Sequence, residues 1–183
     1  MPSVNDIVLT INRNLDLPGS KLYGVAVSAL RENEKFPVVM DANGNGTDCG
    51  INDKYEIIGY HKINQMASRV DGKNGYGDSP GAVVNSYTMQ LIVWQNRKKT
   101  KLYSDELLTL IQSAFPDQVT KGIKPFQSVR LQFNSAILND MQVYNQEYQY
   151  DKPRLLPEHN LFLINYTLET AFEKGCFNTC IES

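Results

Sequence analysis

The chain has 183 residues and a formal net charge of −2, with 42% hydrophobic and 21% charged residues. These proportions are those of an ordinary globular protein and exclude overall disorder. Lysine and arginine are spread along the sequence except in one tight run, Arg97, Lys98, Lys99 and Lys101. This balance excludes the strong basic bias of a typical nucleic-acid-binding protein. We interpret the run as a solvated loop and expect no sequence-specific contact with nucleic acid.

The start of the chain and its cysteines indicate a compartment. Met1 and Pro2 precede apolar residues spaced as on a helix face, which differs from the apolar run of a signal peptide. The longest apolar runs are far shorter than a membrane span. Cys49, Cys176 and Cys180 are an odd number of thiols, which without a signal favours the reduced state. We therefore expect a cytoplasmic protein that has no membrane contact.

The first predicted element is an amphipathic helix over 4–15. Ser3 followed by Asp6 resembles a capping box at the start of this helix. Apolar residues then fall on one stripe at helical spacing, namely Val4, Ile7, Val8, Ile11 and Leu15. Pro18 and Gly19 oppose continuation of a helix, so we expect it to end before them.

Strands are expected next. The β-branched runs 22–30 and 36–40 predict a pair of strands, followed by a loop rich in Gly and Asn over 41–52. The segment 55–63 alternates with apolar residues on both faces, which indicates a strand covered on both sides or one facing a partner chain. A polar stretch over about 66–82 is expected to be a long loop.

The remainder alternates between strands and helices. Strands are predicted over 87–94, 129–133 and 161–172, and a helix capped by Ser104 over 104–115. Residues 140–148 suit either a short helix after Asp140 or a strand. The order predicts a single α+β domain over 1–183: a mainly antiparallel sheet of about five to six strands, with two or three helices packed on one face.

One loop partly matches a calcium-binding motif. Asp41, Asn43 and Asn45 alternate ahead of Gly46, as in the first half of an EF-hand loop. The second half departs from the motif, because Asp48 stands at the eighth position and Asn52 where a bidentate Glu closes the coordination shell. We interpret the segment as a polar hairpin loop, with a weak calcium site at Asp41, Asn43, Asn45 and Asp48 as the alternative.

Other residues that could carry chemistry lack companions. Cys176 and Cys180 form one pair, whereas zinc sites usually need two pairs or added histidines. His61 and His159 have no ligand-type spacing to the cysteines, and no pattern of a nucleophile elbow is present. The glycines Gly72, Gly75 and Gly77 lack the Lys-Ser/Thr of a phosphate-binding loop. We expect no catalytic residues, no cofactor and no enzymatic activity.

Taken together, several segments resemble those of the tail terminator and tail-completion (neck) proteins of long-tailed bacteriophages and prophages. These segments are the helix over 4–15, the strands KLYGVAV and FPVV, the strand YTMQLIVW with the helix that follows it, and LLPEHNLFLINYTLETAF. The resemblance covers most of the chain. It implies a small α+β subunit that closes into a ring, a hexamer in this family, which caps the tail tube and joins it to the head connector. The partners would then be further copies, the tail tube and the head connector, first in the bacterial cytoplasm and later in the virion.

Three other interpretations stay open at this level. The first is a small-ligand or calcium-binding module that uses the Asp41–Asp48 loop. The second is an enzyme whose acid and base groups are assembled from scattered Asp, Glu and His61. The third is a different virion protein, such as a tail tube or baseplate subunit.

Overall fold

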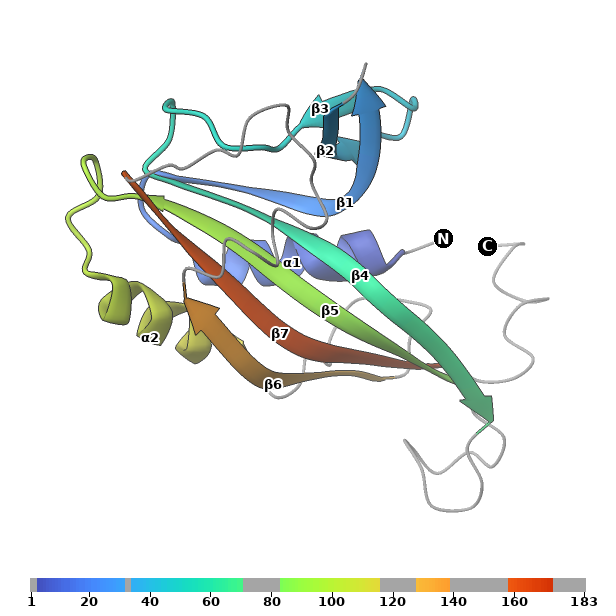
Figure 1. Ribbon diagram of the computed structural model, residues 1–183. Coiled ribbons are helices and arrows are strands. Elements are labelled where there is room, and N and C mark those ends of the chain that lie inside the picture. Colours follow the sequence, from blue (N-terminus) through green and yellow to red (C-terminus); the bar gives the residue numbers. More distant parts are fainter. Residues whose placement is uncertain (1–2, 32–33, 71–82, 116–127, 139–157, 173–183) are drawn as a thin grey trace.

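The structure is a computed structural model that describes residues 3–31, 34–70, 83–115, 128–138 and 158–172 (Figure 1). The described elements are two helices and seven strands. In chain order they are α1 (Val4–Leu15), β1 (Ser20–Arg31), β2 (Glu34–Met40), β3 (Gly46–Asp48), β4 (Ile57–Val70), β5 (Val83–Asn96), α2 (Ser104–Ala114), β6 (Ser128–Leu138) and β7 (His159–Phe172).

All seven strands form one sheet in the order β3-β2-β1-β4-β5-β7-β6. Only β1 and β4 pair in parallel, so the mainly antiparallel α+β fold expected from the sequence is confirmed. Strand β1 has two partners: it pairs with β4 up to the Val25–His61 position, and its remaining residues, Ala26–Arg31, pair with β2. Figure 1 shows β1 curving away from β4 as it makes this change.

Helix α1 forms where the spacing of apolar residues predicts it. The Asp6 carboxylate accepts the Ser3 backbone N–H at 2.6 Å, as in a capping box, and the apolar stripe faces the sheet with Ile7, Val8, Ile11 and Leu15 buried. The close approach of α1 to β1 is fixed by Asn5, whose Oδ1 accepts the Val25 N–H at 2.8 Å. The helix is thus attached by packing and by a specific hydrogen bond.

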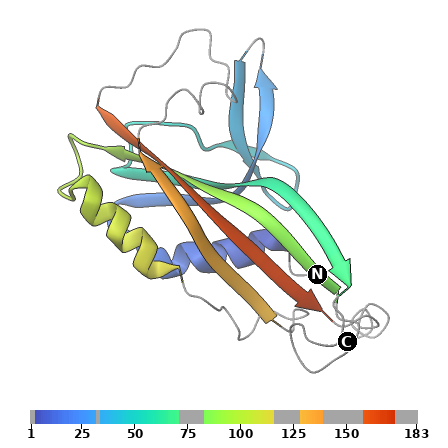
Figure 2. The ribbon, with the colours of Figure 1, turned by 60° about the horizontal axis from the view of Figure 1, so that its bottom comes forward.

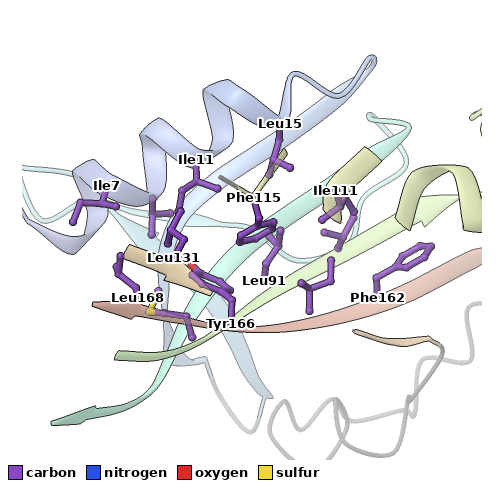
Figure 3. Close-up of a cluster of buried hydrophobic side chains, with 14 of the residues drawn as sticks. Ile7, Ile11, Leu15, Leu91, Ile111, Phe115, Leu131, Phe162, Tyr166 and Leu168 are labelled. Atoms are coloured by element: carbon purple, nitrogen blue, oxygen red, sulfur yellow. The ribbon is translucent and has the colours of Figure 1, made fainter. Parts of the chain in front are cut away.

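Both helices cover the same face of the sheet, as expected (Figure 2). Figure 3 shows the resulting core, in which Ile7, Ile11 and Leu15 of α1 and Ile111 of α2 lie over residues of the sheet. The sheet contributes alternate side chains of β5 and β7, together with Val129 and Leu131 of β6. Burial of this apolar surface is the main force that holds the layers together.

A second, smaller core lies on the opposite face of the sheet. It contains Tyr60, Ile92, Trp94, Leu161 and Leu163 from the central strands, and Ala26 and Cys49 from the part of the chain that crosses over them. This explains why 57–61 is apolar on both faces: Ile57 faces the helices and Tyr60 the second core. The first of the two explanations offered by the sequence, a strand covered on both sides, is correct for this stretch.

Several boundaries differ from expectation. The sheet has seven strands, because the short β3 lies within the expected loop over 41–52. Strand β4 begins at Ile57, after Tyr55, and continues to Val70. The polar loop expected from about 66 therefore starts too early, since backbone pairing with β5 continues through polar, exposed residues. The N-cap of α2 is Tyr103, and Ser104 is the first helical residue. Residues 140–148 lie outside the described ones.

Candidate interaction surface

The second half of β4 is an exposed sheet edge. Residues 57–61 are buried, whereas all eight residues from Ile63 to Val70 are exposed. On one side this stretch pairs with β5 as far as Val70, but on the other side β1 has already turned away to pair with β2. Within the described part of the chain, no strand covers that side of 63–70. Its outward backbone N–H and C=O groups can therefore accept another strand.

This edge also carries apolar side chains on one face. Ile63, Met66 and Val70 are exposed by 37%, 55% and 61%. A bulge between Ile63 and Gln65 keeps Ile63 and Met66 on the same face, next to Met89 and Tyr87 of β5. Because Met89 and Tyr87 belong to the helix-side core, the apolar layer of the molecule runs out to the bare edge. An exposed edge that is apolar on one face is typical of a protein-binding surface.

The polar residues of this stretch are bonded to their own sheet. The Ser68 hydroxyl donates to Asn85 Oδ1 at 2.6 Å, and Arg69 forms an ion pair with Glu169 at 3.3 Å across β5. Neither side chain is therefore held over the outer side of β4. Charged side chains and prolines commonly protect natural sheet edges, and 63–70 contains one charged residue and no proline.

Exposed apolar residues also occur at two other places on the sheet. Ile137 and Leu138 lie at the end of β6, which forms the opposite edge of the sheet and pairs only with β7 among the described strands. Val27 and Leu30 lie on the part of β1 that pairs with β2, and Leu30 is exposed by 75%. The exposed apolar surface thus lies on edge strands and on the projecting β1–β2 pair.

The calcium candidate is a closed hairpin loop between β2 and β3. Asp41 Oδ1 accepts the backbone N–H groups of Asn43 and Asn45, each at 2.8 Å, and Asp41 Oδ2 accepts the Asn45 side-chain amide at 3.1 Å. These bonds, with that from the Asn45 side chain the largest cause, lower the pKa of Asp41. Gly44 takes a positive φ of 81°, which closes the turn. Both carboxylate oxygens of Asp41 are therefore engaged within the loop.

The other calcium candidates do not complete a shell around Asp41. The Asp48 carboxylate accepts the Gly50 N–H at 2.8 Å, so it caps the next turn of the chain. Among the described residues, no three His, Cys, Asp or Glu side chains lie close enough together to hold a metal ion. The Asp41–Asp48 loop thus has the hydrogen bonding of a polar hairpin turn.

His61 is fully buried and belongs to a chain of hydrogen bonds. Its Nδ1 lies 2.7 Å from the Tyr166 hydroxyl and its Nε2 lies 2.8 Å from Asn12 Oδ1, while the Asn12 amide donates to the Tyr23 carbonyl at 2.8 Å. Burial lowers the pKa of His61 to about 3 and raises that of Tyr166. The neutral imidazole therefore joins α1, β4 and β7 inside the core.

His159 lies in a different environment. Neither nitrogen of its ring has a hydrogen-bond partner, although the side chain is only 5% exposed, and the Asp53 carboxylate is 3.8 Å from Nε2. Burial lowers the pKa of His159, and the charges of Asp53 and Glu158 oppose this shift. The two histidines lie on different strands with separate partners, so the structure does not bring them together.

The basic run forms a turn between β5 and α2 that is fixed by buried amides. Gln95 donates to the Leu102 carbonyl at 2.8 Å, and Asn160 donates to the Ser104 hydroxyl at 2.7 Å. Lys98 forms an ion pair with Glu158. The run is thus a solvated turn whose base is held by polar side chains, as its interpretation as a loop requires.

The remaining candidates from the sequence are distributed as follows. Cys49 is fully buried, and burial together with the charge of Asp48 raises the pKa of its thiol to about 12. Cys176, Cys180, Gly72, Gly75 and Gly77 lie outside the described residues. Within the described ranges, neither helix is long and apolar enough to cross a membrane.

Sequence reasoning missed the β4 edge. The apolar spacing of Ile63, Met66 and Val70 is interrupted by the bulge, so it fits neither strict alternation nor a helical stripe. The bulge therefore hid both the strand and its apolar face.

Comparison with known proteins adds no relative: no family model, no curated protein and no solved structure matches this chain.

Proposed function

We propose that this protein is a structural assembly subunit that acts by binding other protein chains, and that it serves as a tail terminator in a bacteriophage or prophage. The observation that carries the proposal is the exposed stretch Ile63–Val70 of β4, with bare backbone on one side and an apolar row on one face. In water, exposed apolar side chains on a bare edge favour association with another chain.

Several features support an assembly role. Exposed apolar residues lie on β4, on β6 and on the β1–β2 pair, so the molecule offers more than one contact surface. A subunit with two different contact surfaces can associate head to tail, and such contacts generate a ring when the rotation between subunits closes. A closed ring of α+β subunits is the arrangement implied by the resemblance to tail terminators.

The terminator assignment adds a specific partner and place. In this proposal the ring caps the end of the tail tube and presents its other side to the head connector. The resemblance over the helix at 4–15, the central strands and the late strand supports this assignment, and the α+β sheet covered by helices on one face is compatible with it.

Electron microscopy of the purified full-length chain tests the proposal. Particles of one closed, rotationally symmetric form are expected over a wide range of protein concentration. Open-ended filaments, or single subunits at every concentration, would contradict a ring-forming terminator. Addition of the ring to purified tail tubes of a long-tailed phage encoding this chain should place extra density at one tube end only.

A further inference from the structure

The sheet has two bare edges of similar length at its two ends. One is the second half of β4, where β1 has left the sheet, and the other is β6, Ser128–Leu138, whose only described strand partner is β7. Both edges present apolar side chains, with Met66 exposed on β4 and Ile137 and Leu138 exposed on β6. One molecule therefore carries two unpaired edges that a second copy could join.

Strand direction allows these two edges to pair between copies. From β4 through β5 and β7 to β6, every neighbouring pair is antiparallel, so β6 runs opposite to β4. A second copy placed in the same orientation at the end of the sheet thus brings its β6 antiparallel to β4 of the first copy. Antiparallel pairing is the more stable arrangement per residue and continues the alternation already present in the sheet.

Charge identifies the occupant as another copy. Residues 63–68 contain no charged side chain, and residues 132–138 of β6 contain none either. Arg69, the one charged residue in 63–70, pairs with Glu169 of its own sheet. Two neutral edges meet without repulsion or an unpaired buried charge, and the small net charge of −2 adds little repulsion between whole copies. A strongly basic or acidic partner would find no complementary charge here.

The faces of the two strands also match. On the helix side, β6 contributes Val129, Leu131 and Phe133 to the core, and β4 ends with the exposed Ile63, Met66 and Val70 on that same side. Joining the edges would therefore place the apolar row of one copy beside the core layer of the next. The exposed apolar surface on β4 would be buried without rearrangement of either sheet.

We propose that β6 of one copy pairs with the Ile63–Val70 edge of β4 in the next copy, which produces one sheet that continues from subunit to subunit. This inference rests on the proposed function, because it names the contact through which the ring would form. The contact is heterologous, so each copy uses β4 toward one neighbour and β6 toward the other.

Two variants that each block one edge provide the test. Met66→Lys places a charge on the β4 edge, and Ile137→Lys places one on the β6 edge; both side chains are largely exposed, so folding should be retained. Leu110→Lys is the matched control, because Leu110 on α2 and Ile137 are both 42% exposed. Circular dichroism establishes that each variant is folded, and light scattering gives its mass.

We expect each edge variant alone to fall to the monomer mass, whereas the Leu110→Lys control keeps the wild-type mass. An equimolar mixture of the two edge variants should form a particle of twice the monomer mass, because one intact β4 edge and one intact β6 edge remain. Variants that keep the wild-type mass, a mixture that stays monomeric, or a control that also dissociates would each overturn the inference.

The same experiment separates this contact from the proposed function. If the wild type forms a closed ring that both edge variants preserve, the edge pairing fails and the ring-forming function stands. If the mixture pairs one to one while the wild type grows into open-ended filaments, the edge pairing stands and the ring fails. A wild type that is monomeric at every concentration contradicts both.

Discussion

His61 and Tyr166 join the middle of β4 to the middle of β7 across β5: the imidazole Nδ1 and the phenolic oxygen are 2.7 Å apart, and their rings meet edge to face with centroids 5.8 Å apart. On its other side the imidazole contacts Asn12 of α1. The helix and the central strands are thus connected by polar bonds within an apolar core, where the loss of one partner is costly.

Tyr166→Phe should lower the free energy of unfolding by about 1–3 kcal/mol, because it leaves His61 Nδ1 buried without a partner. Urea unfolding followed by circular dichroism measures this change. Tyr103→Phe is the control, because the Tyr103 side chain is on the surface with 75% exposure and should change stability little. Equal stability of the two variants would contradict the role given to the Tyr166 hydroxyl.

Acidification should destabilise the protein through His61. Burial lowers the pKa of His61 from about 6.5 to about 3, so between these values the unfolded chain binds a proton that the folded chain excludes. The stabilisation is complete above pH 6.5 and is lost as the pH falls toward 3. At pH 5 the loss from this group should be about 2 kcal/mol.

The contribution of His61 can be separated by comparison with His61→Gln, which does not titrate. The free energy of unfolding of each protein is measured by urea at pH 7.5 and at pH 5. Between these conditions, the variant should lose about 2 kcal/mol less than the wild type. Equal losses in both proteins would show that His61 is not excluded from protonation in the folded state.

Gly24→Ala should destabilise the attachment of α1 to β1. A Cβ at Gly24 would lie 2.1 Å from Asn5 Oδ1, which accepts the Val25 N–H, so the added methyl group must displace this bond. We expect a loss of about 1–3 kcal/mol in the free energy of unfolding. Thermal and urea unfolding measure it, with the exposed Ser28→Ala on the same strand as a control. An unchanged Gly24→Ala protein would mean that the contact is not tight.

Calcium at millimolar concentration should leave the thermal unfolding midpoint unchanged. Both carboxylate oxygens of Asp41 already accept hydrogen bonds from the loop, so a cation would have to break them. Differential scanning calorimetry with calcium, and with magnesium as a comparison, measures the effect. A rise in the midpoint that saturates with calcium and disappears in Asp41→Ala would restore the loop as a calcium site.

Much of the fold follows from local sequence signals. The stripe on α1 and the alternation in β7 predict their elements well, because each buries one regular face against a single layer. The two-sided apolarity of 57–61 also has its explanation in burial on both faces of the sheet. These are features in which the period of the sequence and the burial in the structure coincide.

The edge of β4 could not be predicted in the same way. Its residues are exposed and mostly polar, and the bulge after Ile63 breaks the alternation, so 66–70 has the composition of a loop. Likewise, nothing near His61 in the sequence indicates Tyr166 or Asn12, since their contacts depend on how distant strands and α1 are placed. Long-range pairing, rather than local preference, determines these two sites.

The most direct test of the account is the mass of the wild-type chain in solution, measured by light scattering from low to high protein concentration. An assembly subunit that closes into a ring should reach one fixed multiple of the monomer mass and then grow no further. A mass that stays at one subunit over the whole range, or that rises without limit, would contradict it.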